Sequence, residues 1–240
     1  MHVRPAQARD LADLATNATH AMFDDELTSF MAPYRHQHPL CLRQRFLARS
    51  KARFYSGSLL LAAVTDPTDP WWDGTEKIVG YLSATPHKHA AKTSETSSWL
   101  PWNWNWNWNA LEVQLLRVED LFRWYAHSDR SISRANNREF LKNAASSDPF
   151  AEIDVYWKVD HLSVDPSCQR CGIGSALMKH IQRVATSDNL PIVLLASDKG
   201  RPLYQKLGFA DLRPIPFARG LAVEAMVWYP EKSPSEDSPS

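Results

Sequence analysis

The stretch from residue 156 to residue 196 constrains the fold of this chain more than any other part of it. Tyr156 to Val164 is rich in β-forming residues and closes on Asp165-Pro166, which predicts a strand that ends there. The apolar pattern from Gly174 to about Thr186 predicts a helix. Pro191 to Ala196 is almost continuously apolar, as expected for a strand buried on both faces. A strand, a helix and a second strand in this order indicate a mixed α/β fold.

The rest of the chain supplies further elements around that stretch. We predict additional strands at His2–Ala6, Ser58–Val64, Lys77–Thr85, from Phe209 onward and at Ala222–Tyr229. We predict helices after an N-cap at Asp10, from Pro39 towards Tyr55, and at Leu111–His127, Ser131–Ala145 and Lys199–Leu207.

Residues 86–150 depart from this regular pattern, and we expect them to form an insertion in a single domain that spans residues 1–229. Within them, tryptophan and asparagine alternate strictly from Trp102 to Asn109. Alternation is typical of a strand with one apolar face, but an all-tryptophan face is too bulky for an ordinary core strand. Two interpretations stay open, an aromatic wall for a substrate or partner and a low-complexity insertion on the surface. Residues 230–240 are rich in proline, serine and acidic residues, and we predict a disordered tail.

The overall charge argues against two classes of partner. The chain has 27 lysines and arginines against 27 aspartates and glutamates, so its formal net charge is zero. A neutral chain has no global attraction for nucleic acid or for an anionic membrane surface, and we expect neither as a partner. The first residues lack the apolar run of a signal peptide, and no segment has the length of a transmembrane helix. We therefore expect a soluble protein of the cytoplasm, with the nucleus as the alternative.

The three cysteines are Cys41, Cys168 and Cys171, and three cannot all pair within one chain. Unpaired cysteines are typical of a reducing compartment. Cys168 and Cys171 form a single C-x-x-C pair, which has the spacing of half a zinc site. A stable zinc site needs about four ligands, and no second pair or suitably spaced histidine accompanies this one. We predict that the chain holds no metal.

A glycine-bearing loop, Gln169 to Ser175, lies between the first strand of the constraining stretch and its helix. Gly172 and Gly174 let the backbone turn tightly and approach a ligand without obstruction by a side chain. The first N–H groups of a helix are unpaired, and the helix dipole adds partial positive charge there. With the charge of Arg170 beside it, this turn suits a pyrophosphate, whereas the glycine pair alone also fits a plain helix-opening turn. The loop lacks the lysine of the NTP-binding loop and, at Leu177, the third glycine of the dinucleotide fingerprint.

Two short motifs carry a specific family resemblance. The first comprises Leu162, Val164, Pro166, the run Gln169-Arg170-Cys171-Gly172-Ile173-Gly174, and Leu177. The second comprises Ala196-Ser197, Gly200, Leu203-Tyr204, Lys206 and Gly208-Phe209. In this order they resemble the acetyl-CoA signature, Q/R-x-x-G-x-G/A, and the C-terminal signature of the GNAT superfamily of N-acetyltransferases. The resemblance covers about Val155 to Ala210 and is closest in wording to small GNAT proteins of filamentous fungi.

The resemblance implies a mixed sheet of about seven strands, splayed between the fourth and fifth and flanked by helices. It also implies acetyl-CoA as co-substrate, with the pantetheine arm in the gap and bonded to the main chain of the fourth strand. Carried over to this sequence, those main-chain groups are Leu162, Ser163 and Val164. The remaining cofactor contacts are implied at Gln169, Arg170, Cys171, Gly172, Ile173, Gly174, Ser175, Ser197 and Tyr204.

Acetyl transfer to an amine requires a base for the ammonium nucleophile and favours an acid for the departing CoA thiolate. The resemblance implies Tyr204 as the acid, because the family places a tyrosine near the CoA sulfur. A phenol with the ordinary pKa of about 10 stays protonated at neutral pH. The alternative for Tyr204 is simple packing under Phe209.

The base is expected on the strand before the splay, where members of the family carry acidic or histidine bases. Strict alternation would place residues 158, 160 and 162 on one face and residues 159, 161 and 163 on the other. We predict Asp160 as the base and His161 as the second choice, because the unperturbed pKa of histidine suits the task. A structural hydrogen bond for Asp160, or an ordered water chain in place of any base, stays open. Further candidates are Glu152, Asp154 and Glu224.

Together these features predict an enzyme, an N-acetyltransferase that moves the acetyl group of acetyl-CoA to a primary amine of a small molecule by direct attack in a ternary complex. Two alternatives stay open, acetylation of a protein N-terminus or lysine and a module that binds CoA without turnover. Neutrality and the aromatic insertion favour a small acceptor, because a cationic protein tail would need an acidic groove. The last predicted strand is available to pair across a homodimer. No motif identifies the acceptor.

Overall fold

The computed structural model describes residues 1–88, 108–125, 129–145, 148–218 and 220–231. Its centre is a seven-stranded sheet of order β1-β2-β3-β4-β5-β7-β6. The strands are β1 (His2–Pro5), β2 (Leu59–Val64), β3 (Ile78–Lys88), β4 (Val155–Val164), β5 (Ile192–Ala196), β6 (Ala210–Ala218) and β7 (Leu221–Trp228). Neighbouring strands are antiparallel except β4 and β5, which run parallel. This mixed sheet confirms the predicted fold class.

Helices flank the sheet and were mostly expected from the sequence. Those found in the described ranges are α1 (Leu11–Met22), α2 (Glu26–Met31), α3 (Pro39–Tyr55), α4 (Trp108–Tyr125), α5 (Arg134–Ala145), α6 (Ile173–Asp188) and α7 (Arg201–Lys206). Short 3₁₀ turns precede α1 and α6, namely η1 (Ala8–Asp10) and η2 (Pro166–Cys168). None of the helices in these ranges is long and apolar enough to cross a membrane.

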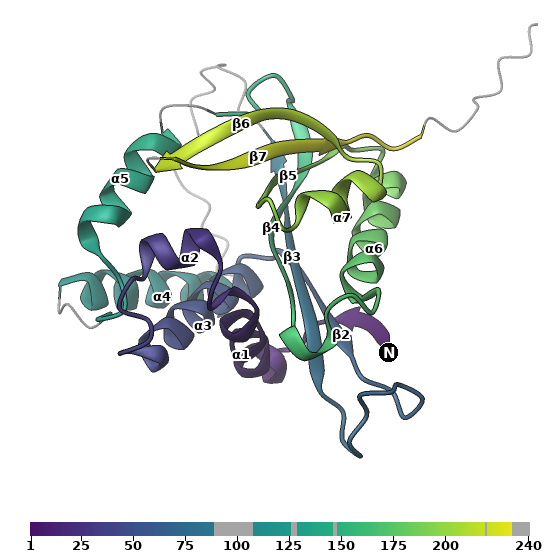
Figure 1. Ribbon diagram of the computed structural model, residues 1–240, viewed down its shortest axis with the longest axis horizontal. Helices are drawn as coiled ribbons and strands as arrows, with labels where there is room; N and C mark the ends of the chain where they lie inside the picture. Colours follow the sequence, from purple (N-terminus) through teal and green to yellow (C-terminus); the bar gives the residue numbers. More distant parts are fainter. Residues whose placement is uncertain (89–107, 126–128, 146–147, 219, 232–240) are drawn as a thin grey trace, which may run out of the picture.

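The helices lie on both faces of the sheet, and each face has its own apolar core (Figure 1). On one face α1 and α3 pack Leu14 and Phe46 against β2 and β3. On the other face α6 packs Leu177 against β2, β3 and β4. Successive side chains of a strand point to opposite faces, so Leu60 of β2 joins the first core and Leu61 the second.

The region expected as an insertion is partly built into the fold. β3 continues to Lys88, so the first residues of the range 86–150 belong to the sheet. α4 packs against α3, and α5 packs against α2 and β6. Trp108 and Asn109, the end of the Trp-Asn repeat, begin α4 and not a strand. Residues 102–107 of the repeat and residues 232–240 of the predicted tail lie outside the described residues.

β4 and β5 are paired over a short distance only. Their register is Trp157↔Ile192, Lys158↔Val193 and Val159↔Leu194. Beyond Val159, β4 continues along β3 to Val164, whereas the end of β5 pairs only with β7. From Asp160 to Val164, one edge of β4 therefore has no described strand beside it. This gap is the splay that the family resemblance implies.

A β-bulge at Asp160 coincides with the start of the splay. Ser83 of β3 pairs with His161, but the next residue, Ala84, pairs with Val159. Asp160 is therefore an extra residue with no partner opposite it, and an extra residue resets the alternation of side chains along its strand.

Because of this bulge, Asp160 and His161 both point towards the α1–α3 face. Thr85 Oγ1 donates to Asp160 Oδ2 at 2.6 Å, and the His161 ring packs on Tyr81 with 4.7 Å between ring centroids. Both side chains also line one pocket with residues of α3. The predicted alternation, which placed residues 160 and 161 on opposite faces, is wrong for this physical reason.

The start of the chain shows two further differences from expectation. Asp10 makes no side-chain cap bond to α1, because it lies inside the η1 turn. Its carboxylate accepts from the Gln7 N–H at 2.7 Å and from Arg4 Nη1 at 2.6 Å, which ties β1 to η1. The short helix α2 was not predicted, and its cap is Asp25, whose carboxylate accepts from N–H groups of its first turn.

Candidate functional site

The loop between β4 and α6 has the shape of an anion-binding turn. Arg170 and Gly172 both adopt left-handed backbone conformations, with φ of 62° and 82°. These two residues lead directly into α6. The first N–H groups of a helix have no partner within it and lie at the positive end of its dipole. Nothing lies within 4 Å of the position that a Cβ at Gly172 would occupy, so the loop is open at that point.

Local hydrogen bonds fix the path into this loop. Asp165 caps the η2 turn by accepting from the N–H of Ser167 at 3.0 Å and from its hydroxyl at 2.6 Å. The Gln169 side chain donates to the carbonyl of Val164 at 3.2 Å. Arg170 remains exposed beside the start of α6. The whole run predicted to hold a pyrophosphate thus lies at the end of β4, next to the splay.

Gly174 lets the start of α6 pack closely where β4 and α7 meet. A Cβ at this position would lie 3.2 Å from Leu203 Cδ2 of α7 and 3.7 Å from Val164 Cγ2 of β4. The two glycines of the loop therefore differ, because Gly172 leaves open space and Gly174 permits close packing.

The main-chain groups that face the gap belong to Leu162 and Val164. The N–H of Asp165 donates to the carbonyl of Val79 on β3 at 2.9 Å, so residue 165 faces β3. Along an antiparallel pair, the main-chain N–H and carbonyl groups of successive residues alternate between facing the partner strand and facing away from it. The N–H and carbonyl of Ser163 therefore also face β3, and those of Leu162 and Val164 face away from it.

Ser163 is engaged elsewhere. It is buried, and its hydroxyl donates to Asn17 Oδ1 of α1 at 2.8 Å. With its main-chain groups turned to β3 as well, Ser163 is not placed to meet a ligand in the gap. Its place among the cofactor contacts, with Leu162 and Val164, stays a prediction.

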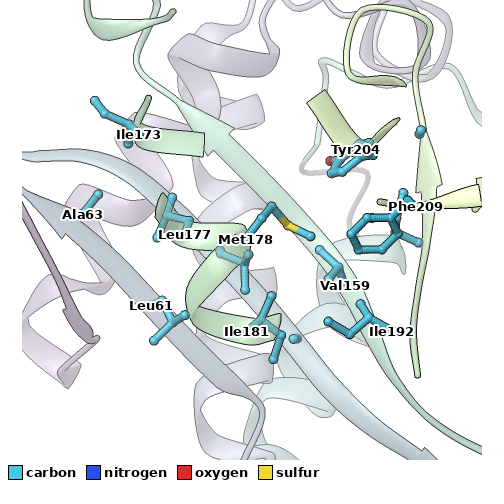
Figure 2. Close-up of a cluster of buried hydrophobic side chains, with 14 of the residues drawn as sticks. Leu61, Ala63, Val159, Ile173, Leu177, Met178, Ile181, Ile192, Tyr204 and Phe209 are labelled. Carbon is cyan, nitrogen blue, oxygen red and sulfur yellow. The ribbon is translucent and has the colours of Figure 1, made fainter. Parts of the chain in front are cut away.

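Tyr204 lies on α7 in the core between α6 and the splayed strands (Figure 2). Its ring packs edge-on against Phe209, with 5.8 Å between ring centroids. Burial raises the pKa of the Tyr204 hydroxyl to about 12, so the phenol keeps its proton at neutral pH. An ordinary thiol has a pKa of about 8.5, so a hydrogen bond to a thiolate is favoured over complete proton transfer. The geometry accommodates both interpretations of Tyr204, packing and donation.

Ser197 forms the turn that opens α7. Its Oγ accepts from the N–H of Gly200 at 3.3 Å, and its carbonyl accepts from the N–H groups of Gly200 and Arg201, each at 2.9 Å. Ser197 follows β5 directly, on the opposite side of the gap from Leu162. Its side chain has a structural role in this turn.

The C-x-x-C pair is divided between two environments. Cys168 is buried in the core that α6 covers, and Cys171 is exposed on the loop. Within the described ranges, no group of three or more histidine, cysteine, aspartate or glutamate side chains is arranged to hold a metal ion. That the chain holds no metal stays a prediction.

A pocket of about 170 Å³ lies on the α1–α3 face at the start of the splay. Asp160 and His161 of β4 line one side, and Arg45, Arg49 and Arg53 of α3 line another. Asp25, Thr28 and apolar side chains of α1, α2 and α3 complete the lining. A partly apolar cavity with a few convergent charged groups is typical of a small-molecule site.

Asp160 is held in this pocket from two directions. Thr85 Oγ1, which is itself hydrogen bonded to Ser58 Oγ at 2.9 Å, donates to the carboxylate. Arg53 Nη2 donates to the Asp160 carbonyl at 3.2 Å. The bulge and these bonds together fix the carboxylate beside the splay.

His161 is poorly suited to bind a proton. Its ring lies near those of Tyr81 and Phe46, and its Nε2 is buried with no hydrogen-bond partner among the described residues. Burial, and then the charges of Arg53 and Arg49, lower the pKa of His161 to about 3. A base must hold the proton it removes, so the environment favours Asp160 over His161.

The other candidate bases lie outside this pocket. Glu152 and Asp154 are exposed ahead of β4. Glu224 of β7 lies directly opposite Ala196 of β5, whose side chain belongs to the core on the α6 face. Side chains of directly opposite residues share a face, so Glu224 points away from the α1–α3 face.

Sequence reasoning missed the three arginines of the pocket. Arg45, Arg49 and Arg53 recur every four residues on α3, which places them along one side of the helix. This spacing was the available signal.

Comparison with known proteins agrees with this geometry. Residues 140–211 match the family model of the acetyltransferase (GNAT) domain. That range contains β4, the glycine loop, α6, β5 and α7. A protein named acetyltransferase from Stachybotrys chartarum is 24% identical over 210 residues, which is 86% of this chain and 79% of that protein.

Solved structures share the fold at low sequence identity. The structure of a histone acetyltransferase HPA2 and related acetyltransferase from Corynebacterium glutamicum covers 97% of both chains, with a TM-score of 0.60 and 19% identity. The structure of arylalkylamine N-acetyltransferase 2 from Aedes aegypti covers 95% of this chain and 98% of its own, with a TM-score of 0.52 and 12% identity. The shared fold thus extends beyond the matched domain over nearly the whole chain.

Proposed function

We propose that this chain, which belongs to the GNAT superfamily of acetyltransferases, transfers the acetyl group of acetyl-CoA to a primary amine of a small molecule by direct attack in a ternary complex. One observation carries the proposal. The anion-binding loop before α6 and the pocket that holds Asp160 adjoin the same splay between β4 and β5.

Acetyl-CoA supplies the activated acetyl group when it is bound. We assign its pyrophosphate to the loop from Gln169 to Ser175 and its pantetheine arm to the gap beside Leu162 and Val164. The unpaired N–H groups at the start of α6, the open space at Gly172 and the exposed Arg170 support the pyrophosphate assignment.

In this proposal Asp160 removes a proton from the ammonium group of the acceptor. The resulting amine attacks the thioester carbonyl directly to form the C–N bond, the C–S bond breaks, and the second proton lost by the nitrogen leaves with CoA as its thiol. Tyr204 donates a hydrogen bond to the departing sulfur, which its burial keeps possible because a pKa of about 12 leaves the phenol protonated. The two groups approach the reacting atoms from opposite faces of the sheet.

The size and charge of the pocket support a small acceptor over a protein tail. Its volume of about 170 Å³ suits a compact acceptor. Its arginines disfavour a lysine-rich tail, which would bring several positive charges to the pocket at once. The presence of Asp160 and Tyr204 at the same splay favours turnover over a module that only binds CoA.

Incubation of the full chain with radiolabelled acetyl-CoA and a panel of small amines and peptides tests the proposal. We expect CoA release that depends on a small amine, and label in that amine. Asp160→Asn should lower kcat and leave the Kd of acetyl-CoA unchanged. Label only in peptides would favour the protein acetyltransferase, and binding of acetyl-CoA without transfer to any amine would favour the non-catalytic module.

A further inference from the structure

We propose that the pocket on the α1–α3 face recognises an anionic group of the acceptor, so that the substrates are small amines that also carry a carboxylate or a phosphate. The inference rests on the proposed acetyl transfer and narrows its acceptor class.

Three arginines reach this pocket from one side of α3. Arg45, Arg49 and Arg53 are separated by four residues each, so they follow one another at about 5.4 Å to 6 Å along the helix axis. Like charges at this spacing repel one another and destabilise a helix. An anion bound at Arg49 relieves that repulsion.

The carboxylates of the pocket are not paired with Arg49 or Arg53. Asp25 caps α2 and accepts from the N–H groups of Leu27 and Thr28. Asp160 accepts from Thr85 Oγ1. Among the described residues, no ion pair joins either carboxylate to Arg49 or Arg53.

Arg49 is the best placed of the three arginines to bind a ligand. Arg53 already donates to Tyr81 Oη at 3.1 Å and to the Asp160 carbonyl at 3.2 Å. Arg49 has no hydrogen bond or ion pair with any residue in the described ranges, and its side chain keeps access to solvent. An unpaired guanidinium of this kind suits two oxygens of a carboxylate or phosphate.

The spacing of the groups sets the size of the acceptor. Arg53 donates a hydrogen bond to the main-chain carbonyl of Asp160, and the backbone position of Arg49 lies about one helical turn, roughly 6 Å, from that of Arg53 along the axis of α3. An acceptor with its amine at Asp160 and its anion at Arg49 therefore separates these groups by only a few carbons. A cavity of 170 Å³ admits a compact molecule of this kind, such as an amino acid or an aminoalkyl phosphate.

Matched pairs of acceptors test the inference. We would compare 4-aminobutyrate with butylamine, and O-phosphoethanolamine with ethanolamine, by CoA release from acetyl-CoA with the full chain. The anionic member of at least one pair should have the higher kcat/KM, by about tenfold or more. Which pair shows the preference distinguishes carboxylate from phosphate.

Variants of α3 assign that preference to the pocket. Arg49→Gln should lower kcat/KM for the anionic amines about tenfold to a hundredfold and leave their neutral partners within about twofold. Lys51→Gln removes the same charge from the same helix outside the pocket and should change neither. Binding of 4-aminobutyrate and O-phosphoethanolamine, measured by calorimetry with CoA present, should weaken in the Arg49 variant only.

Preference for the neutral amines, or an equal loss for both members of a pair in Arg49→Gln, would overturn the inference while acetyl transfer stood. Transfer to no amine at all would instead contradict the proposed function. In that case the calorimetric comparison still decides whether Arg49 binds the anionic amines.

Discussion

At the scale of single residues, burial decides which side chains near the splay stay neutral at physiological pH. Burial lowers the pKa of His161 to about 3 and raises the pKa of Tyr204 to about 12. Both side chains are therefore neutral over the whole physiological range, one as a free imidazole and one as a phenol. Asp160 is left as the group on β4 that offers a carboxylate to the pocket.

Tyr204→Phe should lower kcat about tenfold to a hundredfold, since it removes the proposed donor to the sulfur and keeps the ring against Phe209. The Kd of acetyl-CoA and the urea midpoint should stay close to the wild-type values. Tyr34→Phe, a change at an exposed tyrosine, is the matched control. A wild-type kcat in Tyr204→Phe, under conditions where chemistry limits the rate, would leave Tyr204 with a packing role only.

The depressed pKa of His161 predicts a specific acid sensitivity. Between pH 3 and pH 6.5 the unfolded chain binds this proton more strongly than the folded chain. The contribution of His161 to the free energy of unfolding is therefore complete above pH 6.5 and is lost as the pH falls towards 3.

His161→Phe removes this titration and keeps a ring beside Tyr81 and Phe46. Between pH 6.5 and pH 4.5 the wild type should lose about 1–3 kcal/mol more than the variant in the free energy of unfolding. Urea titrations at several pH values measure the difference, because all carboxylates are common to both proteins. Parallel pH profiles would contradict the prediction.

At the scale of elements, the contact between α6 and β3 depends on Gly80. A Cβ there would lie 2.7 Å from Ile173 Cγ2, 3.2 Å from Leu177 Cδ1 and 3.3 Å from the carbonyl of Ser163. Gly80→Ala should therefore destabilise the fold by about 1–2 kcal/mol, because part of α6 must move away from the sheet.

A double-mutant cycle identifies the contact responsible. Ile173→Ala removes the nearest atom, so Gly80→Ala should cost less in that background than in the wild type. Since Ile173 opens α6, Gly80→Ala should also weaken acetyl-CoA binding. Additive changes in the urea midpoint would show that Gly80 is not required for this packing.

The sequence predicts those elements whose signals are local. The glycine loop could be located because Gly172, Gly174 and the following apolar period lie within a few residues of one another. The bulge could not, because one extra residue at Asp160 shows only in the register of β3 against β4. The orientation of Ser163 could not be predicted for a related reason, since only the pairing of β3 with β4 reveals which main-chain groups face the gap.

At the scale of the whole molecule, the two proposed functions of the site come from different parts of the chain. The proposed cofactor contacts lie between Leu162 and Tyr204, inside the matched range 140–211. The acceptor pocket is lined largely by residues 22–53, far from that range in sequence. The family motifs therefore predict the cofactor side, and the acceptor side becomes readable only when the fold brings α3 to the splay (Figure 1).

This division leads to a prediction for the Trp-Asn repeat. Replacing residues 102–107 with a Gly/Ser linker of equal length should leave the Kd of acetyl-CoA within about threefold of the wild type, since every described residue assigned to the cofactor lies elsewhere. Each tryptophan has about 150–250 Å² of surface to bury, so the segment should matter for acceptor turnover or oligomeric state. Calorimetry, light scattering and kcat/KM for the acceptor panel separate these effects. Loss of acetyl-CoA binding with an unchanged circular dichroism spectrum would assign the segment to the cofactor site instead.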